Sequence, residues 1–150
     1  MNSNKSNLSK DQIDAVKLSI QQKKYDRALE ILNSISNKES NVDLVNRIRA
    51  SVYLYKKDWE KSLLYYQKID NKNNFNILNN MGVAFYKLGR FVEASAMFKE
   101  AISFNNKYIP AYENLSLTQK LLGNYELSIN CILQGLKLMP NNNKIKIFIS

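Results

Sequence analysis

The chain has 150 residues, of which 45% are hydrophobic, and it carries 22 lysines and arginines against 13 aspartates and glutamates, for a formal charge of +9. This hydrophobic content excludes an intrinsically disordered chain, and the length suffices for a buried core or for several stacked repeats. With only four glycines and two prolines, the composition also argues against a loop-rich β protein and favours helices.

The positive charge is scattered along the chain rather than gathered in one run. Such a pattern is typical of a generally basic, solvated surface, so we expect no specific nucleic-acid site. Residues 1–8 lack the apolar stretch of a secretory signal, and no apolar run approaches the ~18 residues of a membrane helix. We therefore expect a cytoplasmic protein without a membrane span, and the single cysteine fits a reducing compartment.

Along the chain, an aromatic residue recurs four times, at spacings of 34, 32 and 34 residues. Each is followed three residues later by Ala or Ser and seven residues later by a large apolar residue. Self-similarity at this period is the signature of a solenoid built from helix pairs. The in-step positions are Tyr25, Trp59, Phe91 and Tyr125; Ala28, Ser62, Ala94 and Ser128; and Leu32, Tyr66, Phe98 and Ile132.

The period divides the chain into four predicted helix pairs. The first opens at Ser9 and Gln12, which have the spacing of a capping box. The second is two residues short, and we place the deletion in its last loop, where deletions are least costly. The predicted segments are 1–8 (a flexible polar tail), 9–42, 43–74, 75–108 and 109–142 (the four pairs), and 143–150 (a short C-terminal cap or the start of a further helix).

Residues 143–150 allow two interpretations. Ile145, Phe148 and Ile149 have the i, i+3, i+4 spacing of one helical face and predict a capping helix for the last pair. The alternation of Lys and Ile in the same segment is also typical of a strand. Without a cover, the last pair would expose an apolar strip, and such strips often mediate self-association.

Two adjacent pairs carry a recognisable pattern. The third reads Leu78-x2-Met81-Gly82-x2-Phe85 and then Ala94-x3-Phe98, and the fourth reads Tyr112-x2-Leu115-Ser116-x2-Gln119, then Ser128-x3-Ile132 and Pro140. This pattern resembles the tetratricopeptide repeat, although three of the four units lack its closing proline. The resemblance implies an all-α fold, a right-handed helical solenoid of about four antiparallel helix pairs. In it, Gly82 and Ala94 would let two helices approach closely, with Phe98 beside them.

Few residues point to catalysis or metal binding. The chain has no histidine, which removes the commonest general base and the commonest zinc ligand. The four glycines form no phosphate-binding loop, and Cys131 is best interpreted as a small hydrophobic residue in or near the core. We expect no enzyme activity, no cofactor and no metal.

The resemblance implies a peptide-binding groove lined by the first helix of each pair, and hence a protein-interaction module with an adaptor or scaffold role. Amides and cations dominate the implied lining, so the partner would be a protein or peptide segment, with acidic segments favoured. The alternative is an assembly subunit that self-associates through its end faces. The implied groove residues are Lys17, Arg47, Ser51, Tyr55, Asn76, Asn79, Asn80, Tyr86, Lys87, Glu113, Asn114, Leu117 and Lys120.

One subtype within that family holds the terminal carboxylate of a chaperone tail with a clamp of lysines, asparagines and an arginine. In this chain, Arg47, Ser51 and Asn80 match part of that clamp. Pro110 and Asn114 stand where its two closing cations belong. We therefore expect this chain not to bind chaperone tails in that way.

Overall fold

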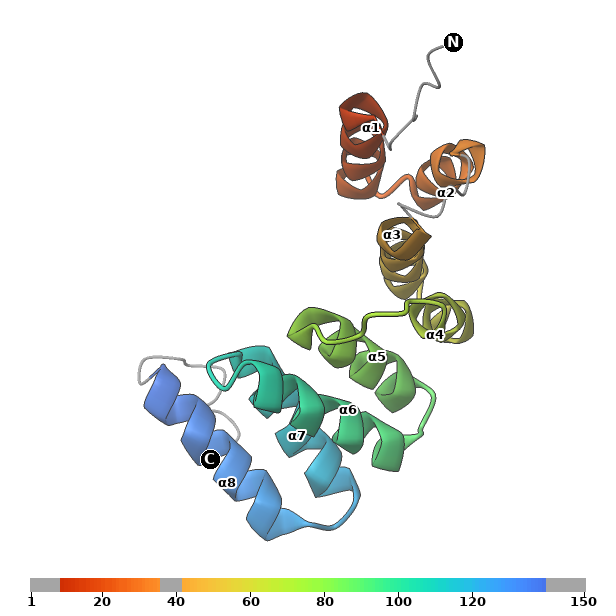
Figure 1. The fold of residues 1–150 in the computed structure, drawn as a ribbon. Helices are drawn as coiled ribbons and strands as arrows, with labels where there is room; N and C mark the ends of the chain where they lie inside the picture. The colour runs from red at the N-terminus through yellow and green to blue at the C-terminus, as the bar shows by residue number, and fades with distance from the viewer. Residues whose placement is uncertain (1–8, 36–41, 140–150) are drawn as a thin grey trace. The chain divides into compact units, whose positions relative to one another are not determined.

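The computed structural model describes residues 9–35 and 42–139, and the regular elements in these two ranges are all α-helices. They fall into two compact units, Met1–Asn71 and Lys72–Ser150. Figure 1 shows each unit as helix pairs joined by short turns. Unit 1 holds α1 (Lys10–Gln21), α2 (Tyr25–Ser34), α3 (Val42–Tyr55) and α4 (Trp59–Gln67), and unit 2 holds α5 (Phe75–Lys87), α6 (Phe91–Phe104), α7 (Ile109–Leu121) and α8 (Tyr125–Leu138).

Local sequence signals explain where several helices begin. At the start of α1, the Ser9 hydroxyl accepts from the Gln12 backbone N–H, and the Gln12 side chain accepts from the Ser9 N–H, each at 3.1 Å. The predicted capping box is therefore confirmed. Asp58 and Asn74 cap α4 and α5 with their side-chain oxygens, and Pro110 lies in the first turn of α7, where its missing N–H costs little.

The turn inside each helix pair uses the same backbone conformation. One residue in each turn has a positive φ, between 58° and 77°, and these residues are separated by 34, 32 and 34 positions. Two of them are glycines, Gly89 and Gly123, which adopt this conformation at little cost. The other two are Lys23 and Lys57, for which the left-handed conformation is strained.

Within unit 1, α1 packs on α2, α2 on α3, and α3 on α4. Its core cluster contains Val16, Ala28, Leu32, Ile35, Val45 and Val52. A buried hydrogen bond of 2.9 Å from the Ser62 hydroxyl to the Ala50 carbonyl joins the two helices of the second pair. Arg49 lies 91% buried and donates to the Leu32 carbonyl at 2.9 Å, which ties α3 to the last turn of α2.

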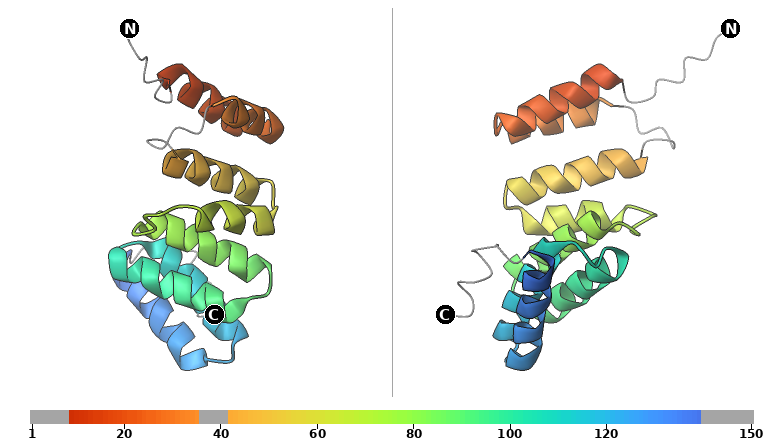
Figure 2. Two further views of the ribbon diagram at one scale, coloured as in Figure 1. Left: turned by 45° about the vertical axis from the view of Figure 1, so that its right-hand side comes forward. Right: turned by 90° about the vertical axis from the view of Figure 1, so that its left-hand side faces the viewer.

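Within unit 2, α5 packs on α6, α6 on α7, and α7 on α8 (Figure 2). The helices α5 and α6 approach closely at Gly82, where an added Cβ would lie 2.5 Å from the Phe98 ring. The predicted Gly82–Phe98 contact is thus confirmed. In the next pair Ser116 is equivalent to Gly82 and Ser128 is equivalent to Ala94, and their hydroxyls lie 3.0 Å apart and form a buried hydrogen bond.

The in-step positions have the role that their spacing predicts. The small residues three after each aromatic are 0–6% exposed, and the large residues seven after it are 0–9% exposed. The aromatic residues themselves begin α2, α4, α6 and α8. The predicted all-α fold of successive helix pairs is therefore confirmed for the described residues. The predicted polar tail, Pro140 and the segment 143–150 lie outside them, and the predicted bounds of the four pairs remain predictions.

Candidate functional site

The predicted groove residues of unit 1 lie on the first helices of its pairs. Arg47, Ser51 and Tyr55 follow one another at intervals of four on α3 and so share one helical face. Arg47 is exposed, and Tyr55 is 56% exposed and stacks on Tyr25 with ring centroids 6.2 Å apart. Lys17, on α1, is exposed and forms a surface ion pair with Asp14 at 3.6 Å.

Ser51 is already engaged within unit 1. Its hydroxyl donates to the Arg47 carbonyl at 3.0 Å and lies 3.2 Å from the Tyr66 hydroxyl of α4. Tyr66 is fully buried, so this contact holds α3 against α4. Arg47 and Tyr55 are the residues of this helical face with most surface open to a ligand.

The predicted residues of unit 2 lie on two first helices that contact each other directly, α5 and α7. A hydrogen bond joins them: the Asn114 side-chain amide donates to the Asn79 side-chain oxygen at 3.0 Å. Asn79 is only 5% exposed, so it serves this contact between helices more than it serves a ligand. We call the surface formed by the two helices the α5–α7 face; its predicted residues are Asn76, Asn79, Asn80, Tyr86, Lys87, Glu113, Asn114, Leu117 and Lys120.

Three polar residues of the α5–α7 face are exposed: Asn76, Lys87 and Lys120. Tyr86 is half-buried, and its ring meets the edge of Phe91 at 5.5 Å. The Lys87 ammonium lies 5.8 Å from the centre of the Tyr86 ring. This face therefore offers two cations, an amide and an aromatic ring that is held in place by packing.

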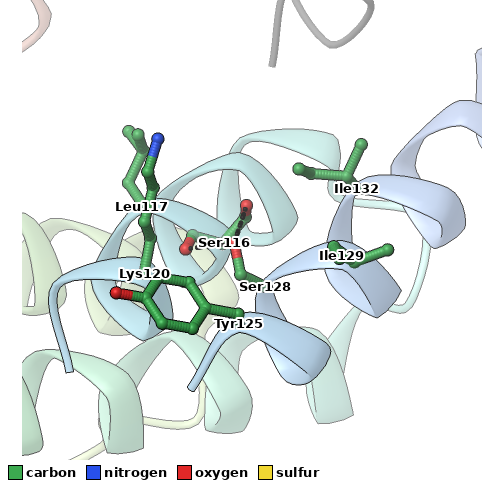
Figure 3. Close-up of a pocket in the computed structure, with 7 residues that line it drawn as sticks. All are labelled: Ser116, Leu117, Lys120, Tyr125, Ser128, Ile129 and Ile132. Atoms are coloured by element: carbon green, nitrogen blue, oxygen red, sulfur yellow. Dashed lines mark hydrogen bonds between the residues drawn. The ribbon is translucent and has the colours of Figure 1, made fainter. Parts of the chain in front are cut away.

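Leu117 and Lys120 also line a pocket of about 140 Å³ between α7 and α8 (Figure 3). Sequence reasoning placed these two residues in a groove but missed the contribution of α8. Alignment of the repeats could have identified the α8 residues of this pocket, because they occupy positions equivalent to those with which α6 packs on its neighbours. The other lining residues are Ser116, Tyr125, Ser128, Ile129 and Ile132.

A buried polar network holds α7 in place. The Gln119 amide donates to the Ser95 hydroxyl of α6 at 2.6 Å, and the Asn124 amide donates to the Gln119 oxygen at 2.8 Å. Gln119 is 2% exposed, so both of its polar groups need these partners. The network explains how a glutamine is tolerated where the repeat pattern has an aromatic residue.

The described residues show little that could perform acid–base or metal chemistry. Within 9–35 and 42–139, no three acidic, thiol or imidazole side chains gather as metal ligands would. Cys131 is half-buried on α8, and burial raises the pKa of its thiol above the usual value, with the Lys99 charge opposing this in part. A thiol in this environment is a poor nucleophile at neutral pH.

In the same two ranges, no helix combines the length and the apolar character needed to cross a bilayer. The second helix of each pair instead carries one buried side, on which the in-step small and large apolar positions lie. Helix pairs with equivalent residues buried at equivalent positions define a protein of helical-hairpin repeats.

Residues 75–108 and 109–142 each match the family model of the tetratricopeptide repeat (TPR), so the two helix pairs of unit 2 are similar to that repeat. It is 26% identical over 113 residues to translocon at the outer membrane of chloroplasts 64 from Pisum sativum. That match covers 74% of this chain, but the chain spans only 19% of the relative's length.

Solved structures share the fold. MamA superposes with a TM-score of 0.80 at 14% identity, over 87% of this chain and 77% of MamA. YrrB, described as a TPR protein with an unusual peptide-binding site, superposes with a TM-score of 0.77 at 14% identity, over 92% of this chain and 72% of YrrB. At these identities, the likeness concerns the fold.

Proposed function

We propose that this chain is a non-catalytic interaction module that binds a segment of another protein on the first helices of its pairs, as an adaptor or scaffold. The observation that carries the proposal is the α5–α7 face. There, two adjacent first helices are held together by the Asn79–Asn114 bond and leave Asn76, Lys87 and Lys120 exposed. The TPR family and the peptide-binding site named for YrrB support the same reading.

The chemistry of the face favours an acidic partner. Lys87 and Lys120 are exposed cations on one face, Arg47 is exposed on unit 1, and the whole chain carries a formal charge of +9. Cations paired with carboxylates form the stronger, charge-assisted hydrogen bonds, and exposed amides can pair with peptide backbone. The partner we propose is thus a peptide segment that carries Asp or Glu, rather than a nucleic acid.

A charge-reversal pair tests this proposal. Peptides selected by the wild-type protein from a displayed random library would be measured for affinity against two double variants. Lys87→Glu/Lys120→Glu changes the α5–α7 face, and Lys99→Glu/Lys137→Glu makes the same charge change at exposed positions of α6 and α8. We expect acidic peptides to be selected, and the first variant alone to lose about tenfold or more in affinity, which corresponds to about 1.4 kcal/mol.

Equal losses in both variants would mean that net charge, rather than this face, attracts the peptides. Selection of peptides without acidic residues would contradict the proposed ligand chemistry. We also propose a cytoplasmic location, which cell fractionation tests directly.

A second candidate function, an assembly subunit that self-associates, rests on a different observation. Large apolar side chains of α8 are exposed, with Tyr125 at 64% and Ile129 at 56%. Exposed apolar strips of this kind often mark contacts between chains. Size-exclusion chromatography with light scattering separates the two functions, because a monomer at all concentrations would count against self-assembly.

A further inference from the structure

The pocket between α7 and α8 combines aliphatic walls with a cation at its edge. Figure 3 shows Leu117 and Lys120 on one side of the pocket and Ile129 and Ile132 on the other. Lys120 is exposed, and it forms no ion pair within the described ranges 9–35 and 42–139. The pocket therefore offers apolar side chains for packing and a positive charge that is open to a ligand.

The polar groups at the bottom of the pocket already have partners. Ser116 and Ser128 lie between its two sides and are 4% and 6% exposed. The Ser128 hydroxyl donates to the Ser116 carbonyl at 3.0 Å and lies 3.0 Å from the Ser116 hydroxyl. Because these groups bond to each other, they need no hydrogen bond from a ligand. An apolar group can thus fill the pocket without leaving a buried polar group unpaired.

The size of the pocket limits what it can hold. Its volume is about 140 Å³. Sites for drug-sized molecules usually measure about 300–1,000 Å³, whereas an apolar cavity of about 150 Å³ is large enough for benzene. The pocket therefore fits a single side chain of about the size of leucine rather than a cofactor.

The pocket adjoins the surface that carries the proposed function. Leu117 and Lys120 belong both to its lining and to the α5–α7 face. A ligand whose carboxylate pairs with Lys120 would therefore bring its neighbouring side chain within reach of the pocket. Charge at the edge and apolar walls inside favour a ligand that carries an acidic and an aliphatic group close together.

We propose that the pocket binds a large aliphatic side chain, of about leucine size, that stands next to an acidic residue in the partner segment. The inference rests on the proposed function, because it describes the segment that the α5–α7 face binds. The aliphatic side chain packs between Leu117 and Ile129, where its burial supplies affinity, and Lys120 pairs with the neighbouring carboxylate. The pocket thus selects the apolar residue of the partner, whereas the cations of the α5–α7 face select its charge.

N-acetyl-leucine tests the proposal, because it carries an isobutyl group and a carboxylate on one residue. Its binding to the full chain would be measured from the chemical shifts of the α7 and α8 backbone amides. For a ligand of this size we expect roughly millimolar affinity. N-acetyl-alanine should bind about tenfold more weakly, since it buries less apolar surface, and N-acetyl-leucinamide about threefold more weakly, since it lacks the carboxylate.

Two pairs of variants locate the site. Ile129→Asp places a charge in the pocket, whereas Leu127→Asp makes the same change at an exposed residue of α8 outside its lining. Lys120→Gln removes the cation at the edge, and Lys137→Gln removes a cation elsewhere on α8. We expect Ile129→Asp to weaken N-acetyl-leucine binding about tenfold or more and Lys120→Gln about threefold, with both controls unchanged. Lys120→Gln should leave the binding of N-acetyl-leucinamide unchanged.

Other outcomes would overturn the inference. Unshifted α7 and α8 amides at ligand concentrations far above a millimolar would show that the pocket does not take this side chain. Equal losses in Ile129→Asp and Leu127→Asp would show the same. A dimer in light scattering that N-acetyl-leucine dissociates would assign the pocket to a second copy of the chain.

The displayed peptide library separates this inference from the proposed function. Selected acidic peptides that lack an aliphatic neighbour, and that bind Ile129→Asp as well as wild type, would contradict the inference about the pocket alone. Binding of N-acetyl-leucine at the pocket without any selected peptide would support the pocket and contradict the proposed function.

Discussion

Replacing Gly82 with alanine tests the close packing of α5 against α6 in unit 2. In an unconstrained helix, this change stabilises by about 1 kcal/mol through helix propensity. Here the new Cβ would lie 2.5, 2.7 and 2.9 Å from three atoms of the Phe98 ring, whereas favourable carbon–carbon contacts need roughly 3.5–4.0 Å. Phe98 is 1% exposed, so its ring has no open space into which to move.

Overpacking of a well-packed core costs about 1–3 kcal/mol, and three overlapping atoms put this case in the upper half of that range. Subtracting the propensity gain, we expect Gly82→Ala to lower the free energy of unfolding by about 1–2 kcal/mol. Urea unfolding followed by circular dichroism measures this value.

A double-mutant cycle supplies the control. Phe98→Leu removes two of the three clashing ring atoms, Cε1 and Cζ, so Gly82→Ala should be clearly less destabilising in that background than in the wild type. The reasoning would be refuted if Gly82→Ala alone made the protein more stable than the wild type, since helix propensity would then outweigh any steric overlap.

Two further predictions concern the turns and the thiol. Lys57→Gly should raise the free energy of unfolding by up to about 1 kcal/mol, because the relief of a left-handed backbone is offset in part by the entropy of glycine in the unfolded chain. Gly89→Ala, at the equivalent position, should lower the free energy of unfolding. Urea unfolding of both variants measures these changes, and reversed signs would contradict the reasoning. Cys131 should react with iodoacetamide more slowly than a free cysteine at neutral pH, because burial raises the pKa of its thiol and leaves less thiolate. The labelling rate should keep rising with pH above the usual pKa of cysteine, and it should reach the rate of free cysteine in urea. Faster labelling of the folded protein would contradict this expectation.

Sequence reasoning was most reliable for the inside of each helix pair. Ala94 and Phe98 could be assigned to the core because every pair repeats the same local geometry, so the same type of residue recurs at the same spacing. The capping box at Ser9 depends only on neighbours a few residues away, and it is confirmed.

The candidate binding surface could be predicted only in outline. The resemblance to the repeat family assigned Asn79 and Asn114 to a groove, yet these residues are 35 positions apart and bond to each other between α5 and α7. Which of their polar groups remain open depends on how closely two helices of different pairs approach. That distance is set by side chains on both helices, which the spacing along one helix does not describe.

The amino-acid sequence by itself determined that this chain forms helix pairs, which residues line the inside of each pair, and which family of repeats its pairs resemble. Only the tertiary structure decided which polar residues bond across successive pairs, as Gln119 does with Ser95, and which apolar side chains of α8 stay exposed. The physical reason is that periodic burial arises within one hairpin, whereas contacts between hairpins join residues distant in sequence whose meeting depends on the packing of whole helices.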